Sequence, residues 1–273
     1  MGRYLKIIAC EIALREICHA AARSTNVIDL EFVTQGLHDH PAAGRQRLQE
    51  LVDAQPTDKY DALLIGYASC GNILQGLRAS HTPLVVPRAH DCITFFLGSR
   101  ARYQELSQSL PSAYFYTSGW IECLRRRGGS TPPAHLAPLP ARAGDSTAAN
   151  ATYKQWVEKY GEENAQHLLE IMTRWTENYT HGVLIDFDFT RPLHLHEQVR
   201  RICGQRGWEY QEIEGDLRLL QHWVDGEWDL DSFLVVPPGH QIIPSYNDSV
   251  IAAVPAAPET MSPPPASSPN PPA

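Results

Sequence analysis

The sequence lacks long apolar runs and lacks an excess of basic charge. It contains 23 Lys and Arg against 31 Asp and Glu, which gives a formal net charge of −8 at pH 7. A membrane helix needs about 20 consecutive apolar residues, and no run approaches that length. Binding along a nucleic-acid backbone needs clustered Lys and Arg. The composition therefore predicts a protein with no membrane span and no nucleic-acid partner.

The N-terminus also lacks a signal peptide, because the short apolar stretch after Leu5 is followed at once by charged residues. We therefore expect a cytoplasmic protein. The cytosol is reducing, so structural disulfides are not expected there. The six cysteines are then free thiols, metal ligands or nucleophiles.

Nucleotide-binding fingerprints are absent as well. The segment GYASCGN, residues 66–72, has small residues and glycines after an apolar run, but neither the lysine of a P-loop nor a GxGxxG pattern. Such a segment can let backbone amides approach an anion or a cofactor closely. We therefore take Gly71 and Asn72 as candidate cofactor-binding residues.

Apolar, β-branched segments alternate with segments of helical periodicity through the first half of the chain. This alternation predicts an α/β fold, with a mostly parallel sheet flanked by helices. The expected strands are 5–10, 27–33 and 113–120, together with 60–72, which ends in a Gly-flanked loop, and 82–92, which includes an exit loop. The expected helices are 14–24, 44–55 and 93–108.

Composition divides the chain into four parts. Residues 1–126 form an N-terminal α/β half, and residues 127–151 form a Pro/Ala/Gly-rich loop or linker. Residues 152–253 repeat the alternation as a second, smaller α/β half. The Pro- and Ser-rich residues 254–273 are expected to be a disordered tail.

Reactive side chains gather where the expected strands end. In an open parallel sheet, ligands bind at the carboxyl ends of the strands. The side chains expected at that edge are Cys10, Glu11, Cys70, Arg88, His90, Asp91, Cys92 and Glu122. Thiolates with an imidazole suit zinc, iron or an iron–sulfur cluster.

These side chains are given separate roles. Cys10, Cys70, Cys92 and His90 are the candidate metal ligands. His90, Asp91 and Glu122 are the candidate catalytic groups. Glu11 and Arg88 join Gly71 and Asn72 as cofactor-binding candidates, because a guanidinium can clamp an anion through two hydrogen bonds. A surface salt bridge is an equally weighted interpretation of Arg88.

Other histidines and cysteines receive less weight. His38, Asp39 and His40 either extend the metal site or form a helix-capping turn. His194 and His196 are two residues apart, so within a helix they would face opposite sides and make a poor metal site. Cys18 and Cys203 lie in helical patterns and are expected in the core. Cys123 could be either a core thiol or a functional one, and both interpretations stay open.

Several sequence blocks resemble a prokaryotic family known only as domain of unknown function 1638. The blocks include REICHAAARS, LLIGYASCGNILQGL, PLVVPRAHDCITFFLGSRARY, YFYTSGWIE, GWEYQEIEGD and FLVVPPGHQI. GYxxCGN and PRxHDCI are the most specific, and the resemblance covers most of residues 5–242. It implies an association with corrinoid-dependent methyltransferase systems and brings no established activity.

These observations lead to one hypothesis with open alternatives. The leading one is a metal-binding α/β protein that acts on a small molecule, with the resemblance suggesting methyl or one-carbon transfer and a corrinoid carried by a partner. The first alternative is a non-catalytic binder or chaperone for a metal or a corrinoid. The second is a metal-free enzyme with Cys70 or Cys92 as nucleophile and His90 as base. An interaction protein with buried, inert thiols is the third.

Overall fold

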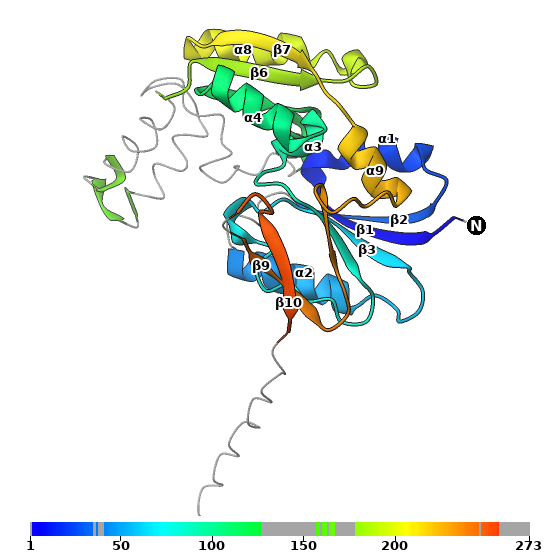
Figure 1. The fold of residues 1–273 in the computed structure, drawn as a ribbon. Coiled ribbons are helices and arrows are strands. Elements are labelled where there is room, and N and C mark those ends of the chain that lie inside the picture. Colours follow the sequence, from blue (N-terminus) through cyan, green and yellow to red (C-terminus); the bar gives the residue numbers. More distant parts are fainter. Residues whose placement is uncertain are drawn as a thin grey trace, which may run out of the picture.

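The computed structural model describes residues 2–34, 37, 41–126, 157–158, 160–162, 164–166, 178–245 and 247–256. These residues form a five-stranded sheet, a three-stranded sheet and a two-stranded sheet. In Figure 1, β6, β7 and α8 lie at the top, and β1 and β3 lie below them. The predicted α/β class is confirmed.

The five-stranded sheet has the order β2-β1-β3-β4-β8. Its first four strands run parallel, and β8 is antiparallel to β4. The strands are β1 (Tyr4–Cys10), β2 (Val27–Val33), β3 (Ala62–Gly66), β4 (Leu84–Pro87) and β8 (Phe233–Val236). The central strands β1, β3 and β4 are almost wholly apolar and buried, as expected for a parallel sheet covered on both faces.

The three-stranded sheet is parallel throughout, with the order β5-β6-β7. Its strands are β5 (Ala113–Tyr116), β6 (His181–Asp186) and β7 (Glu209–Glu214). The two-stranded sheet pairs β9 (His240–Pro244) with β10 (Ile251–Pro255) in antiparallel fashion. β5 comes from the first half of the chain and β8 from the second, so the two larger sheets interleave along the sequence.

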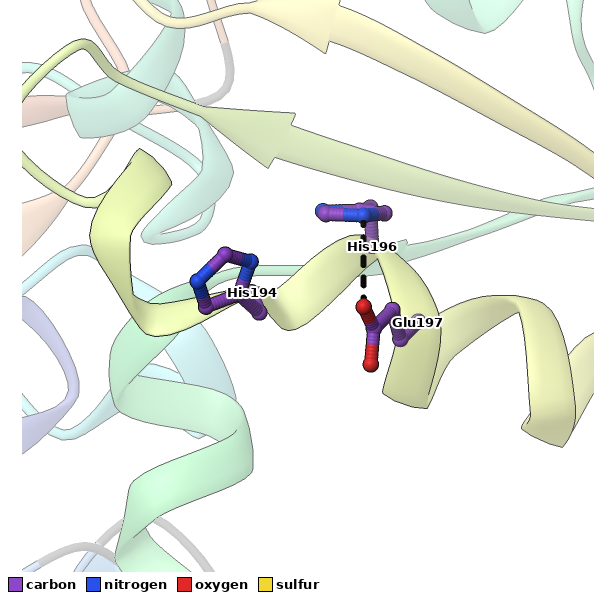
Figure 2. Close-up of side chains that lie close together, drawn as sticks. All are labelled: His194, His196 and Glu197. Carbon is purple, nitrogen blue, oxygen red and sulfur yellow. Dashed lines mark ion pairs between the residues drawn. The ribbon is translucent and has the colours of Figure 1, made fainter.

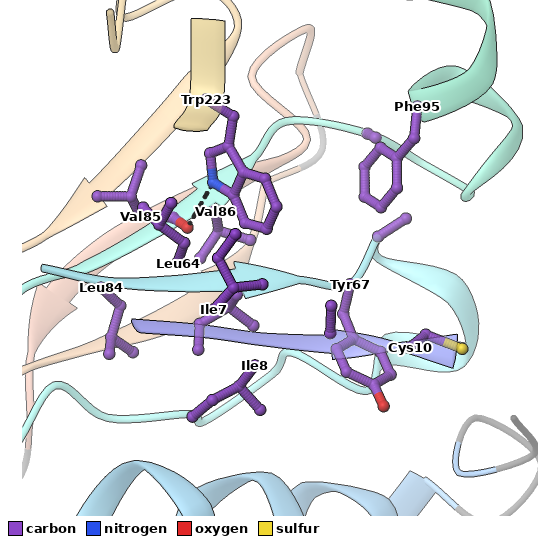
Figure 3. Packing of buried hydrophobic residues seen from close by; sticks show 14 of the residues in the cluster. Ile7, Ile8, Cys10, Leu64, Tyr67, Leu84, Val85, Val86, Phe95 and Trp223 are labelled. Atoms are coloured by element: carbon purple, nitrogen blue, oxygen red, sulfur yellow. Dashed lines mark hydrogen bonds between the residues drawn. The ribbon is translucent and has the colours of Figure 1, made fainter. Parts of the chain in front are cut away.

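Helices follow most of the parallel strands. They are α1 (Leu14–Arg23), α2 (Pro41–Asp53), α3 (Ile93–Leu97), α4 (Arg100–Ser109), α5 (Ser118–Arg126), α8 (Leu195–Arg206) and α9 (Arg218–Asp225). Three short 3₁₀ turns are η1 (Glu11–Ala13), η3 (Cys70–Asn72) and η4 (Arg191–Leu193). Figures 1 and 3 show α9 on one face of the five-stranded sheet and α2 on the other.

The main core forms around the five-stranded sheet. Trp223 of α9 is fully buried there, and its indole Nε1 donates a hydrogen bond to the Val85 carbonyl at 3.1 Å (Figure 3). A second cluster, including Val199, lies under the three-stranded sheet. Trp120 of α5 packs against both clusters, so α5 joins the two sheets.

Several predicted segments differ in detail from the structure. The strand and Gly-flanked loop expected over 60–72 are confirmed, with the strand ending at Gly66, but the expected helix 93–108 is divided at Gly98, whose positive φ of 74° ends α3. The expected strand 113–120 ends at Tyr116 and lies in the other sheet, so Glu122 does not follow a strand of the five-stranded sheet. Val254 and Pro255, predicted as tail, belong to β10. The linker 127–151 and residues 257–273 lie outside the described residues, and the domain boundaries stay a prediction.

Candidate functional site

Three of the predicted cysteines come to the carboxyl edge of the five-stranded sheet. Cys10 ends β1, Cys70 lies on the loop after β3, and Cys92 lies on the loop after β4. Because β1, β3 and β4 are neighbours and run parallel, their carboxyl ends meet at one edge. We call Cys10, Cys70 and Cys92 the thiol cluster.

Backbone hydrogen bonding fixes the two loops that carry Cys70 and Cys92. The Ser69 amide donates to the Ala89 carbonyl at 2.9 Å, which ties the loop after β3 to the loop after β4. Beyond Cys70, both Gly71 and Asn72 have left-handed backbones, with φ of 57° and 58°. Glycine adopts this conformation freely and asparagine tolerates it, which explains why the loop can turn sharply after Cys70.

Cys70 and Cys92 form a hydrogen-bonded pair. The pKa of Cys70 is lowered because the Cys92 thiol donates a hydrogen bond to its sulfur, although burial opposes this effect. The same hydrogen bond, with burial and the nearby charge of Asp91, raises the pKa of Cys92 well above its usual range. A donated hydrogen bond stabilises the charged acceptor, so Cys70 loses its proton more easily than Cys92.

Cys10 is the most deeply placed member of the thiol cluster. Burial, with smaller contributions from the neighbouring Glu11, Cys70 and Cys123, raises the pKa of its thiol to about 12. The influence of Cys123 shows that α5 also reaches this site. Cys123 is buried, and its Sγ lies 3.1 Å from the Trp120 carbonyl oxygen. The structure therefore brings a fourth thiol near Cys10.

Tyr67 lies beside Cys10, and sequence reasoning missed it. Its hydroxyl is buried and, among the described residues, has no hydrogen-bond partner. Burial and the nearby Cys10 and Glu11 raise its pKa. Figure 3 shows the ring next to the end of β1 that carries Cys10. A buried hydroxyl without a partner is costly, so it marks a place where a ligand would be stabilised.

The other predicted site residues have mixed placements. Glu11 is buried beside Cys10. Asp91 accepts hydrogen bonds from the Tyr103 hydroxyl at 2.5 Å and from the Ile93 amide at 2.8 Å, which starts α3. His90 is exposed on the loop between β4 and α3. Asp91 is therefore held by two hydrogen bonds, and its charge acts on both Cys70 and Cys92.

Arg88 and Glu122 have structural partners. The Arg88 Nε donates to the carbonyls of Leu230 and Phe233 at 2.9 and 3.1 Å, and its Nη1 donates to the carbonyls of Ser249 and Ile251. Arg88 thus connects β4 to the segments around β8 and β10, which gives the anion-clamp prediction no support. Glu122 forms a two-pronged ion pair with Arg15 of α1, with a closest N···O distance of 2.6 Å.

The surface helix start expected at 194–197 is confirmed, but the prediction that His194 and His196 face opposite sides was wrong. His194 is not inside the helix but caps it, with a left-handed backbone at φ 52°, and α8 begins at Leu195. The two imidazole rings therefore lie near each other, with centroids 5.9 Å apart (Figure 2). His38, Asp39 and His40 lie outside the described residues.

Across the described residues, one group of at least three His, Cys, Asp or Glu has all its ligand atoms within 4.8 Å of one another, and it is His194, His196 and Glu197. The thiol cluster does not meet this condition, so its three sulfurs lie near one another without forming a closed ligand set. The prediction of a metal at Cys10, Cys70, Cys92 and His90 stays a prediction.

The fold and the site define an α/β protein with a thiol cluster at the carboxyl edge of its main parallel sheet. Residues 32–224 match the family described as a protein of unknown function, DUF1638, and the chain belongs to that family. The matched range is narrower than the resemblance seen in the sequence blocks. No curated protein and no solved structure matches the chain. None of the described helices has the length and apolar character needed to cross a membrane.

Proposed function

We propose that the thiol cluster binds a thiophilic metal, zinc or iron, and that this site is the centre of the protein's activity. The observation that carries the proposal is the meeting of Cys10, Cys70 and Cys92 from three neighbouring strands, each within electrostatic reach of the others. A single nucleophile needs no such convergence, whereas thiolate ligands do.

The protonation states suit metal binding in two ways. The lowered pKa of Cys70 makes the thiolate that a metal requires easier to form. Cys10 and Cys92 are protonated in the metal-free protein, so metal binding would release their protons. Tetrahedral zinc with Zn–S bonds of about 2.3 Å holds its sulfurs about 3.8 Å apart. Binding therefore requires the thiol cluster to draw together.

The proposed chemistry is methyl or one-carbon transfer on a small molecule, linked to a corrinoid carried by a partner protein. This part of the proposal rests on the family resemblance alone. A bound zinc with an open position would supply Lewis-acid activation of a thiol, a water or a methyl acceptor. The charge of Asp91 acts on Cys70 and Cys92, so Asp91 can orient a substrate near them, and His90 is exposed on the same loop. We place this activity in the cytoplasm, where the cysteines stay reduced.

Elemental analysis of anaerobically purified protein tests the metal site. We expect near-stoichiometric zinc or iron at the thiol cluster of the wild type and about one equivalent less metal in the Cys70→Ser/Cys92→Ser double variant. The matched control is Cys18→Ser/Cys203→Ala, which removes two thiols from α1 and α8 and should keep the metal. Wild-type protein that holds no metal, even after anaerobic reconstitution, would sink the proposal.

A second candidate function is a metal-free thiol enzyme with Cys70 as the nucleophile. One observation favours it: the pKa of Cys70 is lowered by Cys92, as in an activated cysteine. Metal-free protein whose Cys70 alone reacts quickly with an electrophile at neutral pH would favour this candidate over the metal site.

A further inference from the structure

A cluster of potential metal ligands lies at the start of α8, on the three-stranded sheet. His194, His196 and Glu197 offer two imidazole nitrogens and one carboxylate oxygen, all within 4.8 Å of one another. These residues lie at the start of α8, which packs into the second core cluster, whereas the thiol cluster lies at the edge of the five-stranded sheet. The two sets of ligands are therefore separate.

The local backbone brings the two imidazoles together. His194 follows the turn η4 and has a left-handed backbone, with φ 52° and ψ 38°. Its amide donates to the Arg191 carbonyl at 3.0 Å, and its carbonyl accepts from the Glu197 amide at 3.3 Å. His194 is thus fixed from both sides just outside the helix, and its ring lies on the same side as that of His196.

The residues of α8 that face the core hold this arrangement in place. Leu195, between the two histidines, is buried in the second core cluster together with Val199. Because Leu195 points into the core, His194 and Glu197 are exposed and His196 is partly exposed. The ligand set is consequently open to solvent and can exchange a metal ion, while its backbone is anchored by buried leucine and valine.

The distances between the ligand atoms suit a shared metal ion better than direct hydrogen bonds between the side chains. The His196 Nε2 and the Glu197 Oε1 are 4.0 Å apart, too far for a hydrogen bond (Figure 2). Tetrahedral zinc with bonds of about 2.0–2.2 Å to nitrogen and oxygen would hold its ligand atoms about 3.3 Å apart. Small side-chain rotations close that difference. The helix dipole opposes a cation at this end, but the Glu197 carboxylate in the first turn offsets it.

We propose that His194, His196 and Glu197 bind a divalent transition metal, with zinc as the reference ion. Two imidazoles and a carboxylate form a ligand set that zinc accepts, and three protein ligands leave a fourth position for water or a bound molecule. This site is independent of the thiol cluster and does not depend on the function proposed for it.

Calorimetric titration with zinc chloride tests the site in the full chain carrying Cys70→Ser/Cys92→Ser, so that the thiol cluster does not compete. We expect one site with a dissociation constant in the micromolar range or tighter. His196→Gln should weaken it by about tenfold or more, since even loss of a hydrogen-bonding group behind a ligand costs about 10- to 100-fold. His194→Asn should do the same, and asparagine tolerates the left-handed backbone of position 194.

The matched control is His222→Gln/Glu227→Gln. His222 and Glu227 form another imidazole–carboxylate pair, with a similar N···O distance of 3.7 Å, but they are not part of a group of three ligands among the described residues. The control should bind zinc like its parent. Equal binding by the parent and by His196→Gln, or no binding by the parent, would overturn the proposal.

Cobalt(II) added to the protein with all its cysteines gives a second readout. Sulfur ligation produces strong near-ultraviolet charge-transfer absorption, whereas nitrogen and oxygen ligation produces only weak visible bands. His196→Gln should remove the visible bands of a nitrogen–oxygen site and leave any sulfur signal unchanged. If His196→Gln removes the sulfur signal alone, the result counts against the proposal. If instead the thiol cluster binds no metal, the visible bands of the nitrogen–oxygen site should still be present.

Discussion

The Cys92 thiol donates a hydrogen bond to the sulfur of Cys70, and this contact displaces the pKa values of the two thiols in opposite directions. The chain separates the two residues by a loop, a strand and a second loop, so only the pairing of β3 with β4 makes the contact possible. The relationship gives Cys70 and Cys92 different chemistry, although both are partly buried cysteines.

Alkylation should detect this difference directly. In protein treated with a chelator, Cys70 should react with iodoacetamide at a lower pH than Cys92. Cys92→Ala should raise the pH midpoint of the alkylation of Cys70 by about one to two pH units, because a hydrogen bond to a charged group is worth about 1.5–3 kcal/mol. The pH dependence of the alkylation rate, followed by mass spectrometry, measures both midpoints.

The control for this experiment is Cys203→Ala, since Cys203 lies in the second core cluster. Its removal should leave the midpoint of Cys70 unchanged. Faster alkylation of Cys92 than of Cys70 at neutral pH would contradict the assignment of donor and acceptor.

A buried carboxyl group should make the stability of the protein depend on pH. Glu16 of α1 is fully buried, and its Oε1 accepts a hydrogen bond from the Ser118 hydroxyl at 2.8 Å. Burial raises the pKa of Glu16 from 4.5 to about 7. Below the unfolded-state pKa, Glu16 is protonated in both states and costs nothing. As the pH rises towards about 7, the unfolded state ionises first, so the native state loses stability.

Glu16→Gln should remove this loss while its amide oxygen still accepts from Ser118. At pH 8 we expect the variant to be more stable than the wild type by on the order of 2–3 kcal/mol, with the difference vanishing near pH 4.5. Urea unfolding across this pH range measures it. The control is Glu105→Gln, at an exposed position, and its stability relative to the wild type should not change with pH. If the stability difference of Glu16→Gln is also independent of pH, the effect is refuted.

Arg88 should matter for stability and not for thiol chemistry. Its guanidinium donates to four backbone carbonyls of the segments around β8 and β10. A lysine cannot reproduce this fork, so Arg88→Lys should lower the free energy of unfolding by about 2–4 kcal/mol. The alkylation midpoint of Cys70 should not move.

Arg47→Lys serves as the comparison, because Arg47 makes an exposed ion pair with Glu50 and its replacement should change stability by less than about 1 kcal/mol. A stable Arg88→Lys protein with altered Cys70 reactivity would instead favour the anion-clamp interpretation.

The close approach of α5 to η1 should depend on Gly119. A Cβ at this position would overlap the Ile12 carbonyl oxygen, so Gly119→Ala must push α5 away. We expect a loss of about 1–3 kcal/mol, as for other overpacked sites. Because α5 carries Cys123 to the side of Cys10, the pKa of Cys10 should change as well.

Gly204→Ala on α8 is the matched control, since a Cβ added at Gly204 would have no neighbouring atom within 4 Å outside its own helix backbone. Alanine in an exposed helix should stabilise the protein by about 0.5–1 kcal/mol. Thermal unfolding of both variants shows whether the contact at Gly119 exists.

Local sequence patterns were enough to place most elements of the fold. The segment 27–33 became β2 with the same bounds, and Gly207 ends α8 with the left-handed backbone expected of a helix-capping glycine. The same reasoning could not place β5, because strand propensity does not say which sheet a strand joins. It also missed the direction of the His194 ring, since a single left-handed residue before a helix changes that direction.

The sequence by itself determined the α/β class, the three thiols at the ends of β1, β3 and β4, and the membership of the family. Apolar periodicity and residue type carry that information along the chain. Only the tertiary structure decided that Cys92 donates to Cys70, that Cys123 and Tyr67 join Cys10, and that Arg88 faces backbone carbonyls. These contacts link residues far apart in the chain, and strand order and helix packing set them, because no local pattern records which segments become neighbours.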